Sequence, residues 1–575
     1  MARVLVLGED TRAFLAVVRS LGRADIEVHV AWCPWNSAAL QSRYVRHVHS
    51  IAQYRSDARA WLDDFNRLCR EHQFELVLPC TDGTILPLQL HRDELEHADR
   101  VCLLPDDVYR TLSSKEETYI LARRLGVPLP AQVTASTLEQ VRAAADEFGF
   151  PLVLKPKSSA SKLAPLVRRK VEKVYRAEDL DAIAGPMLHG DILAQQNFTG
   201  IGVGVEVLCK DGDVLTAFQH ERIHEPLMGG GSSYRKSVPL HEGMLDATDR
   251  LMKALRYTGV AMAEFKYNLQ TRSWVLIEIN ARFWGALPLS MAAGLDFPRY
   301  LYEMLCHGRS DFPRQYRTNV YSRHWSSDLQ WMRVNLTADH RNPDVMSLPW
   351  GRVAAELVHI ALLRERSDTF VWDDPRPAIA DLREYFGHKL FAVTKGLGVL
   401  RGPRYRETLR AVRVAKKIIF ACHGNICRSP FASAVLDAMR IEGITCFSAG
   451  CFPAESRRSP DAAIEAAARF GIDLSEHGSH VLTPGDVEAA DLILVFDRRN
   501  VDEIEGLFAG VRTKLGYLGA LDQARSLEIA DPYGSGVEEF LKCYERIQRI
   551  IREVWAGSPC AAERDSGMKP NRILG

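Results

Sequence analysis

The chain lacks any excess of charge of one sign, because 73 Lys and Arg residues balance 73 Asp and Glu residues. This balance gives no global basic face, so composition offers no argument for a nucleic-acid partner. The sequence also has no apolar run long enough to span a bilayer and no signal-peptide pattern. We therefore expect a cytoplasmic protein without a transmembrane segment.

Regular cysteine spacing is also missing. The twelve cysteines form no evident disulfide framework, which fits a reducing cytoplasm, and no paired CxxC sets indicate structural zinc. Neither an internal repeat nor a low-complexity tract is present. With 575 residues, 46% of them hydrophobic and 25% charged, the chain is too long for one core. We expect three or four globular units.

The most informative stretch is residues 418–430, IIFACHGNICRSP. Its apolar start predicts a buried strand. Ser429 and Pro430 predict a helix start, because serine caps helix N-termini and proline suits the first turn. The intervening loop can therefore direct backbone N–H groups at an anion. Arg428 adds a two-pronged phosphate ligand, and the same positive field favours the thiolate of Cys422 as a nucleophile.

The Cys-x5-Arg spacing in this setting predicts phosphoryl-transfer chemistry. The alternative is a buried structural cysteine beside an arginine. That alternative leaves unexplained why Gly424, Asn425, Arg428 and Ser429 crowd one turn.

The first 112 residues alternate between apolar strand patterns, at 4–8, 27–31 and 76–79, and helical patterns. This order predicts a βαβ arrangement with a parallel sheet. The turn after Gly8 lacks the second and third glycines of a dinucleotide fingerprint, so no nicotinamide site is expected.

A second candidate site lies on two predicted hairpin strands, 261–266 and 274–280. Alternate strand residues share a face, so Glu278 and Asn280 point the same way and Glu264 can join them. Two carboxylates and an amide oxygen suit Mg²⁺, which commonly also binds nucleotide phosphates. The alternative is the ordinary polarity of an edge strand.

With this pattern, residues 1–310 resemble the ATP-grasp family of carboxylate–amine and carboxylate–thiol ligases. The most specific piece is residues 278–285, EINARFWG. The resemblance implies ATP and Mg²⁺ as cofactors, with Lys115 and Lys155 on the phosphates, the strand from Gln195 to Phe198 facing adenine, and Arg282 at the reacting phosphate. The implied ATP-binding residues are Lys115, Lys155, Gln195, Gln196, Asn197, Phe198 and Arg282, and the implied metal ligands are Glu264, Glu278 and Asn280.

One segment departs from the family pattern. The family carries a glycine-rich loop after the lysine strand, whereas residues 157–162 contain serines but no glycine, and such a backbone is less free to wrap a phosphate. Residues 229–233, GGGSS, are predicted to be a mobile substrate loop, with a plain surface loop as the alternative.

Residues 311–414 are the least informative. Trp325, Trp331, Trp350 and Trp372 are expected to anchor a core rather than contact a ligand. The basic stretch 401–417 is interpreted as a solvated helix that links two domains. Attraction to membrane phosphates is the alternative.

From residue 417 to 556 the βαβ pattern returns, and this region resembles the low-molecular-weight protein tyrosine phosphatases. Four pieces carry the resemblance in family order: the loop 422–430, residues 448–450 (SAG), the strand ending at Asp497, and residues 531–533 (DPY). It implies Cys422 as nucleophile, Arg428 as phosphate ligand and Asp531 as general acid and base. The implied phosphate-loop and supporting residues are His423, Gly424, Asn425, Ile426, Cys427, Ser429, Ser448 and Tyr533.

Three details bear on the substrate. Ile426 stands where the arginine-phosphatase branch prefers threonine, so phosphotyrosine is favoured over phosphoarginine. Pro430 is present, and Cys543 and Cys560 lie away from the place of shuttle cysteines, which ranks arsenate reduction low. Cys427 stands five residues after Cys422, as in family members that form a protective reversible disulfide.

The sequence thus predicts an α/β multidomain chain. The expected parts are a pre-ATP-grasp α/β domain (1–112), an ATP-grasp α+β domain (113–310), a helical extension and basic linker (311–414), a doubly wound parallel-sheet phosphatase domain (415–557) and a flexible tail (558–575). The expected function joins a phosphotyrosine protein phosphatase to an ATP-dependent ligase of a small carboxylate and an amine. The alternative is a phosphatase regulated by a nucleotide-binding module that ligates nothing.

Overall fold

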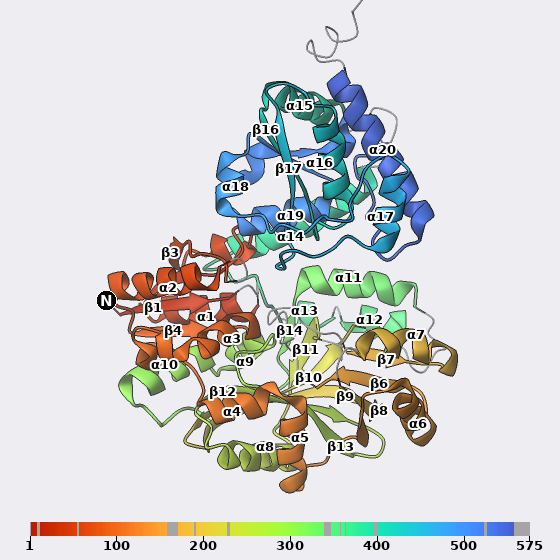
Figure 1. Ribbon diagram of the computed structural model, residues 1–575. Helices are drawn as coiled ribbons and strands as arrows, with labels where there is room; N and C mark the ends of the chain where they lie inside the picture. The colour runs from red at the N-terminus through yellow and green to blue at the C-terminus, as the bar shows by residue number, and fades with distance from the viewer. Residues whose placement is uncertain are drawn as a thin grey trace, which may run out of the picture. The chain divides into compact units, whose positions relative to one another are not determined.

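A computed structural model describes residues 2–8, 12–54, 57–157, 171–188, 191–226, 231–338, 347–356, 358–362, 364–394, 401–522 and 526–556. The chain divides into two compact units (Figure 1). The first comprises Met1–Cys33, Ser37–Ile51 and Arg59–Arg383, and the second comprises Pro34–Asn36, Ala52–Ala58 and Glu384–Gly575. Within the described residues, no helix is long and apolar enough to cross a membrane.

The first unit begins with a four-stranded sheet in the order β3-β2-β1-β4, in which every pairing is parallel. The strands are β1 (Arg3–Leu7), β2 (Glu27–Ala31), β3 (Val45–His49) and β4 (Leu76–Pro79), and the nearby helices are α1 (Ala13–Arg23), α2 (Ala58–His72) and α3 (Asp82–Leu90). Apolar strands buried on both faces are typical of a parallel sheet covered by helices. The predicted βαβ arrangement is confirmed.

A small antiparallel sheet follows, in the order β5-β8-β6-β7. Its strands are β5 (Gln132–Ala135), β6 (Leu152–Pro156), β7 (Glu172–Val174) and β8 (Ile192–Gln196), and its neighbouring helices are α4 (Asp106–Ser113), α5 (Lys115–Arg124), α6 (Leu138–Phe148) and α7 (Leu180–Ala184). Lys155 lies near the end of β6 and Lys115 begins α5, as the sequence predicts.

The largest sheet has seven strands in the order β13-β12-β9-β10-β11-β14-β15. They are β9 (Ile201–Lys210), β10 (Asp213–His224), β11 (Tyr234–Ser237), β12 (Gly259–Tyr267), β13 (Trp274–Asn280), β14 (Tyr321–Arg323) and β15 (Glu365–Ser367). The associated helices are α8 (Glu242–Ala254), α9 (Leu287–Ala293), α10 (Phe297–His307), α11 (Trp325–Leu336), α12 (Trp350–Glu356) and α13 (Val358–Ala361). One apolar core joins this sheet to the first one through residues such as Val4, Leu208 and Leu301.

The region after residue 310 differs from the expected helical extension, because β14 and β15 continue the seven-stranded sheet. The tryptophans there, which are expected to anchor a core, agree with that expectation only in part. Trp331 is buried and stacks on His224 with ring centroids 3.6 Å apart, but Trp350 is 40% exposed and Trp372 is 90% exposed. Trp372 precedes a turn that is held by its aspartates, so the ring itself is not needed in the core.

The second unit contains a four-stranded parallel sheet in the order β17-β16-β18-β19. Its strands are β16 (Lys417–Cys422), β17 (Thr445–Gly450), β18 (Leu492–Val495) and β19 (Leu515–Tyr517). The further helices are α14 (Arg376–Thr394), α15 (Arg401–Val414), α16 (Arg428–Ala438), α17 (Asp461–Ala468), α18 (Pro484–Ala489), α19 (Arg498–Leu507) and α20 (Val537–Ala556). The doubly wound parallel-sheet prediction is confirmed.

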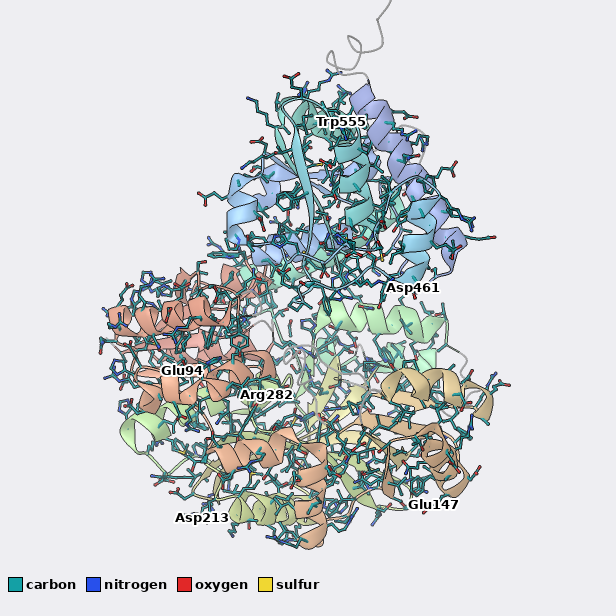
Figure 2. All side chains as sticks on the ribbon, viewed as in Figure 1. Glu94, Glu147, Asp213, Arg282, Asp461 and Trp555 are labelled. Atoms are coloured by element: carbon teal, nitrogen blue, oxygen red, sulfur yellow. The ribbon has the colours of Figure 1, made fainter. Side chains whose placement is uncertain are left out.

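Aromatic residues of α20 close the core of this domain. Tyr544 stacks on Phe431 with ring centroids 3.9 Å apart and donates its hydroxyl hydrogen to the carbonyl of Cys427 at 3.1 Å. Trp555, labelled in Figure 2, is 1% exposed. The basic helix α15 also contributes to this core through the buried side chain of Val412. The basic stretch is therefore a packed helix of the second unit.

A buried ion pair fixes the turn after β15 in the first unit. Arg19 of α1 donates from Nε to Asp374 Oδ2 at 2.9 Å, and Ser42 donates to the same oxygen at 2.6 Å. Both charged side chains are at most 3% exposed. Burial lowers the pKa of Arg19, and the hydrogen bond and charge of Asp374 act in the opposite direction. The positive charge of the buried Arg19 guanidinium is thus stabilised by the Asp374 carboxylate.

The neighbouring aspartates test this dependence. Asp374→Ala leaves the Arg19 charge buried without its partner, so the free energy of unfolding should fall by about 3–5 kcal/mol. Asp373→Ala is the control, because Asp373 pairs with Arg23 where both side chains are more than a third exposed, and the expected loss is about 1 kcal/mol or less. Urea unfolding followed by tryptophan fluorescence measures both; equal losses would contradict the buried-pair account.

Candidate functional sites

The loop between β16 and α16 folds around the sulfur of Cys422. The backbone N–H of Asn425 donates to this sulfur at 3.3 Å, and Ser429 Oγ lies 3.0 Å from it. Asn425 Nδ2 donates to the same Ser429 oxygen at 2.9 Å. Ser429 Oγ accepts this hydrogen bond, and its own hydroxyl hydrogen can be donated to the sulfur or to the carbonyl oxygen of Ala449, which lies 3.5 Å away. These contacts hold the sulfur at the base of the loop.

Asn425 holds the loop in its unusual shape. Its φ is +50°, in the left-handed region that asparagine tolerates better than most residues. Its side-chain oxygen accepts from the backbone N–H of His480 at 2.8 Å, and its carbonyl lies 2.8 Å from His477 Nε2. The loop is therefore fixed by a segment more than fifty residues away in the sequence.

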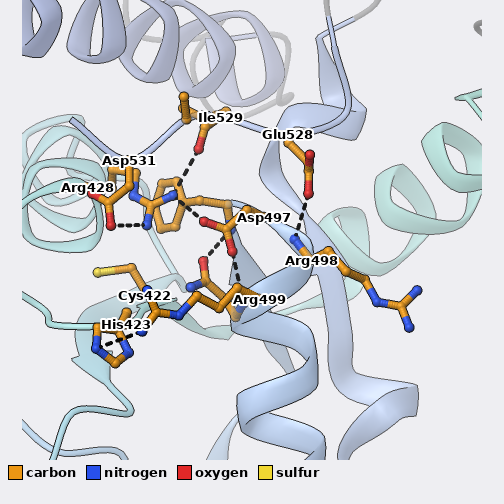
Figure 3. A network of polar contacts seen from close by, with 12 residues as sticks. Cys422, His423, Arg428, Asp497, Arg498, Arg499, Glu528, Ile529 and Asp531 are labelled. Carbon is orange, nitrogen blue, oxygen red and sulfur yellow. Dashed lines mark hydrogen bonds and ion pairs between the residues drawn. The ribbon is translucent and has the colours of Figure 1, made fainter. Parts of the chain in front are cut away.

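Arg428 is 1% exposed and is surrounded by acceptors (Figure 3). It donates from one terminal nitrogen to Asp497 at 2.6 Å and to the carbonyl of Ile529 at 2.9 Å, and its other terminal nitrogen lies 2.8 Å from Asp531. Burial alone would lower the pKa of Arg428, but the charges of Cys422, Asp531 and Asp497 raise it. The guanidinium therefore stays charged.

One donor of this arginine is left over. Arg428 Nε is buried and has no hydrogen-bond partner among the described residues. A buried unpaired donor is costly, and a charged donor close to a helix N-terminus suits a bound oxyanion. This atom is the plainest structural indication of an anion site.

The remaining predicted residues of this site occupy distinct places. Asp531 and Tyr533 lie on the exposed side of the site. The side chain of Asp531 is 36% exposed, and Tyr533 is 62% exposed. Ser448 lies on β17 beside Phe420, whereas the side-chain hydrogen bonds around the Cys422 sulfur come from Asn425 and Ser429. Cys427 is a buried free thiol whose pKa is raised by burial.

Sequence reasoning missed the polar partners at the mouth of the loop. His423 Nδ1 lies 2.9 Å from Glu503, and Arg499 donates to His423 Nε2 at 3.1 Å. Arg499 also binds Glu503 at 2.8 Å. Arg457 lies over the ring of Phe452, 4.3 Å from its centroid. These residues carry no motif, so only the fold could bring them together.

The second predicted site is assembled on β12 and β13. Their antiparallel register sets Glu264 directly opposite Glu278, as the hairpin prediction requires. Asn280 Nδ2 donates to Glu278 Oε1 at 3.2 Å, and Arg282 donates to Asn280 Oδ1 at 3.0 Å. The cluster thus offers two carboxylates and an amide oxygen, the donor set that Mg²⁺ prefers.

Both predicted phosphate-binding lysines face this cluster. The positive charges of Lys115 and Lys155 oppose the effect of burial and lower the pKa of Glu278. Lys155 itself is buried; its Nζ lies 3.4 Å from the Tyr119 hydroxyl, which also receives a contact from Gln195 Nε2 at 3.5 Å. Burial lowers the pKa of Lys155 to about 8, against the raising effect of Glu278 and Glu264.

Other predicted members of the ATP site are more scattered. Gln195 is buried, but Gln196 at the end of β8 is exposed, and Asn197 and Phe198 are half-buried. Arg282, labelled in Figure 2, forms a two-pronged pair with Asp82 at 2.7 and 3.0 Å. The serine-rich segment at 158–162 and residues 229–230 of the predicted substrate loop lie outside the described residues, as does Cys560.

Arg222 is a partner that the sequence did not reveal. It donates to both carboxylate oxygens of Glu264, at 2.8 and 2.6 Å, and to Glu225 at 3.3 Å. Lys266 also pairs with Glu225 at 3.0 Å. A cation that binds Glu264 must therefore share this carboxylate with Arg222 or displace it.

The parallel sheet with a thiol, an arginine and a carboxylate around one loop defines the class of cysteine-dependent phosphatases. Comparison with known proteins gives the family. Residues 417–558 match the model of the low molecular weight phosphotyrosine protein phosphatases. The chain is 38% identical over 140 residues to a probable low molecular weight protein-tyrosine-phosphatase, EpsP, of Ralstonia nicotianae, covering 24% of this chain and 93% of that protein. The chain belongs to this family through its C-terminal domain.

Another relative bears on specificity. The protein-arginine-phosphatase of Bacillus subtilis is 29% identical over 140 residues, which cover 24% of this chain and 93% of the relative.

In the first unit, residues 189–325 match a family described as ATP-grasp in the biosynthetic pathway with Ter operon. The N-terminal part therefore contains an ATP-grasp domain.

Solved structures are similar to the same part of the chain. The L-amino acid ligase of Bacillus licheniformis has a TM-score of 0.43 at 16% identity and covers 56% of this chain and 78% of its own. The biotin carboxylase domain of the Hydrogenobacter thermophilus 2-oxoglutarate carboxylase, in complex with MgADP, has a TM-score of 0.45 at 16% identity and covers 56% and 73%.

The close approach of the phosphatase loop explains why β17 ends in a residue without a side chain, Gly450. A Cβ atom there would lie 2.9 Å from both the backbone nitrogen and the Cβ of Asn425 and 3.0 Å from the carbonyl oxygen of His423. Gly450→Ala should therefore push the loop off the sulfur and lower kcat for p-nitrophenyl phosphate at least tenfold. Gly485→Ala is the control, since the nearest atom to its Cβ is a side-chain oxygen at 3.9 Å. Steady-state kinetics decides, and unchanged kcat in Gly450→Ala would refute the steric argument.

Proposed function

We propose that the C-terminal domain, residues 415–557, hydrolyses phosphotyrosine in proteins. The observation that carries the proposal is the buried Nε of Arg428, which has no hydrogen-bond partner among the residues that the structure describes and lies next to the loop around the Cys422 sulfur. A phosphate oxygen in the loop satisfies this donor and meets the backbone N–H groups at the start of α16. Family membership and the Ralstonia relative's name support the same activity.

In the first step, the Cys422 thiolate attacks phosphorus. The sulfur–phosphorus bond forms as the bond from phosphorus to the phenolic oxygen breaks, and Asp531 gives its proton to that oxygen. In the second step, Asp531 takes a proton from water, the water oxygen attacks phosphorus, and the sulfur–phosphorus bond breaks. Inorganic phosphate and the thiolate are released, so the enzyme is unchanged. Arg428 and the loop stabilise the charge on the phosphoryl oxygens in both steps.

The contact between Asp531 and Arg428 has a part in this sequence. The Asp531 carboxyl group lies 2.8 Å from the guanidinium. A substrate phosphate that takes over this guanidinium nitrogen displaces Asp531 from Arg428 and leaves its side chain next to the phosphate, where it can reach the leaving oxygen.

The side chain of Tyr533 supports an aromatic leaving group, because it stands exposed two residues after the acid. Its ring can stack against a phenyl group at the mouth of the site. Phosphoarginine is the second candidate, since a relative with that named activity is similar over the same residues. Ile426 at the position where that branch prefers threonine favours phosphotyrosine.

Substitution of the reacting groups tests the assignment. Cys422→Ser should abolish hydrolysis of p-nitrophenyl phosphate and of a phosphotyrosine peptide, and Asp531→Asn should lower kcat by about 10²–10⁴-fold because proton transfer is lost. Cys446→Ser is the control, a half-buried thiol on β17. A phosphoarginine peptide is assayed in parallel. Activity retained by Cys422→Ser refutes the mechanism, and faster turnover of phosphoarginine refutes the substrate.

We further propose that the ATP-grasp domain is an ATP-dependent ligase. The convergence of Lys115 and Lys155 on the carboxylate of Glu278 supports it. Mg²⁺, when bound, would be held by Glu264, Glu278 and Asn280 and would neutralise phosphate charge. Lys115, Lys155 and Arg282 orient the triphosphate while a substrate carboxylate oxygen attacks the γ-phosphorus and ADP leaves. An amine then attacks the carbonyl carbon of the acyl phosphate, and inorganic phosphate leaves.

The second candidate for this domain is a nucleotide-binding module that regulates the phosphatase without ligating anything. Residues 157–162, which contain no glycine where the family has its phosphate loop, favour this candidate. The run from Glu278 to Arg282 favours the ligase, because it joins metal ligands to a cation for the reacting phosphate.

ADP release separates the two candidates. The full chain with ATP, Mg²⁺ and pools of amino acids and small carboxylates should form ADP only when the correct pair of substrates is present. Glu278→Gln should abolish ADP formation, and Glu242→Gln, an exposed position in the first turn of α8, should not change it. Tight ATP binding without ADP from any pool would exclude the ligase and leave the regulatory module.

A further inference from the structure

A group of histidines lies on β2, β3 and the end of α2, outside both sites described above. His29 comes from β2, His49 ends β3 and His72 ends α2. One nitrogen from each of these three rings lies within 4.8 Å of the others. Residues from three separate elements thus direct their imidazoles at one point.

The rings are packed face to face and edge to face. His29 stacks on His49 with ring centroids 5.0 Å apart and an angle of 12°, and His72 lies 4.7 Å from His49. Phe74 closes the group, stacked on His72 at 5.6 Å and edge-on to His29 at 5.1 Å. An apolar ring behind the imidazoles holds their orientation.

Glu27 selects the tautomer of His29. The Nε2–H of His29 donates to Glu27 Oε1 at 2.9 Å, so its Nδ1 carries a lone pair. That Nδ1 lies 2.8 Å from His49 Nε2, which therefore supplies the hydrogen of this contact. A carboxylate that accepts from the outer nitrogen of a histidine is the common support of a metal-binding imidazole.

Two of the three imidazoles are also in a form that suits a metal. Burial and the neighbouring rings of His29, His72 and His47 lower the pKa of His49 to about 4. Burial likewise lowers the pKa of His29, against the raising effect of Glu27. Neutral imidazoles are the form that binds metals, so protons compete little for His29 and His49 near neutral pH.

We propose that His29, His49 and His72 bind a divalent transition metal of the zinc class. With Zn–N distances of about 2.0–2.1 Å, tetrahedral ligand nitrogens stand about 3.3 Å apart, so the 2.8 Å contact between His29 and His49 has to open by about half an ångström. The metal replaces the hydrogen between these two nitrogens, and the proton leaves for His49 Nδ1 or solvent. Water supplies the fourth ligand.

A different trio, Glu27, His29 and His47, also comes within reach of one point. It is the weaker choice, because it needs His29 Nε2 and so loses the hydrogen bond to Glu27. Its third member is also exposed, with 56% of the His47 side chain accessible. The proposed trio keeps the Glu27 contact.

The position of the metal indicates what it does. β3 is an edge strand of its sheet, and its three central residues are exposed. A metal held by β2, β3 and α2 ties this edge strand and the end of the helix to the interior of the sheet. Because the metal binds the folded chain and not the unfolded chain, it raises the stability of the fold by mass action.

Metal titration of the full chain tests the proposal. The protein is freed of any affinity tag, stripped with a chelator and used as the Cys422→Ser variant, so that the phosphatase thiol does not bind metal. Co²⁺ should bind with one equivalent per chain and give the visible absorption of a tetrahedral nitrogen and oxygen site, and Zn²⁺ should displace it. Zn²⁺ should also raise the Tm of the first unit.

Variants then assign the ligands. His29→Gln, His49→Gln and His72→Gln should each weaken Zn²⁺ binding at least tenfold, and Glu27→Ala should weaken it about 10- to 100-fold. His97→Asn is the control, an exposed histidine of the same unit. His47→Gln should have little effect; a loss as large as that of His49→Gln would move the site to the second trio and overturn the proposal.

X-ray absorption at the zinc edge of the chain with intact histidines keeps the proposal testable if a variant fails to fold. Three imidazole nitrogens at about 2.0–2.1 Å are expected. Sulfur in the first coordination sphere, or no stoichiometric metal at micromolar concentration, would mean that the histidines only pack against one another.

Discussion

The buried charge of Arg428 is the constraint on which the phosphatase site depends. A guanidinium that is 1% exposed needs compensation from charges and acceptors around it. The chain supplies Asp497 from the end of β18, Asp531 from the segment before α20 and the carbonyl of Ile529. These contacts bring the end of β18 and the segment before α20 to one side chain at the start of α16. One of the partners, Asp531, is also the acid of the proposed reaction. Arg428 is therefore the cation that pairs with Asp531 in the empty site and with the phosphate in the occupied site.

The ATP-grasp domain meets the same constraint with the signs reversed. Glu264 and Glu278 lie opposite each other on adjacent strands, where two carboxylates repel. Arg222 binds both oxygens of Glu264, and the two lysines act on Glu278. Burial lowers the pKa of Arg222, and the charges of Glu264 and Glu225 more than offset it. The protein's own cations thus balance the two carboxylates. Binding of a metal and a nucleotide would require these ion pairs to be exchanged.

The sequence predicted those parts of each site whose residues lie close together along the chain. The loop from Cys422 to Arg428 and the hairpin with Glu278 and Asn280 are local, and their strand, turn and helix signals gave both the residues and their relative directions. The partners His480, Glu503 and Arg222 come from remote segments and carry no motif. The histidine cluster shows the same limit: His47 and His49 share a strand, but the contributions of His29 and His72 depend on the packing of β2 and α2.

The two sites differ in how much must change before a ligand binds. In the phosphatase loop, the sulfur is held by the Asn425 N–H and the Ser429 hydroxyl, and Asn425 is fixed in turn by the backbone of His480. None of these contacts uses the Arg428 donors that the proposed mechanism assigns to phosphate, whereas Asp531 occupies one of them. In the ATP-grasp cluster, Glu264, Asn280 and Arg282 all bind protein groups that a metal or phosphate would replace. Preorganisation therefore favours the phosphatase site, whereas the proposed ligation would require a rearrangement of ion pairs before its first step.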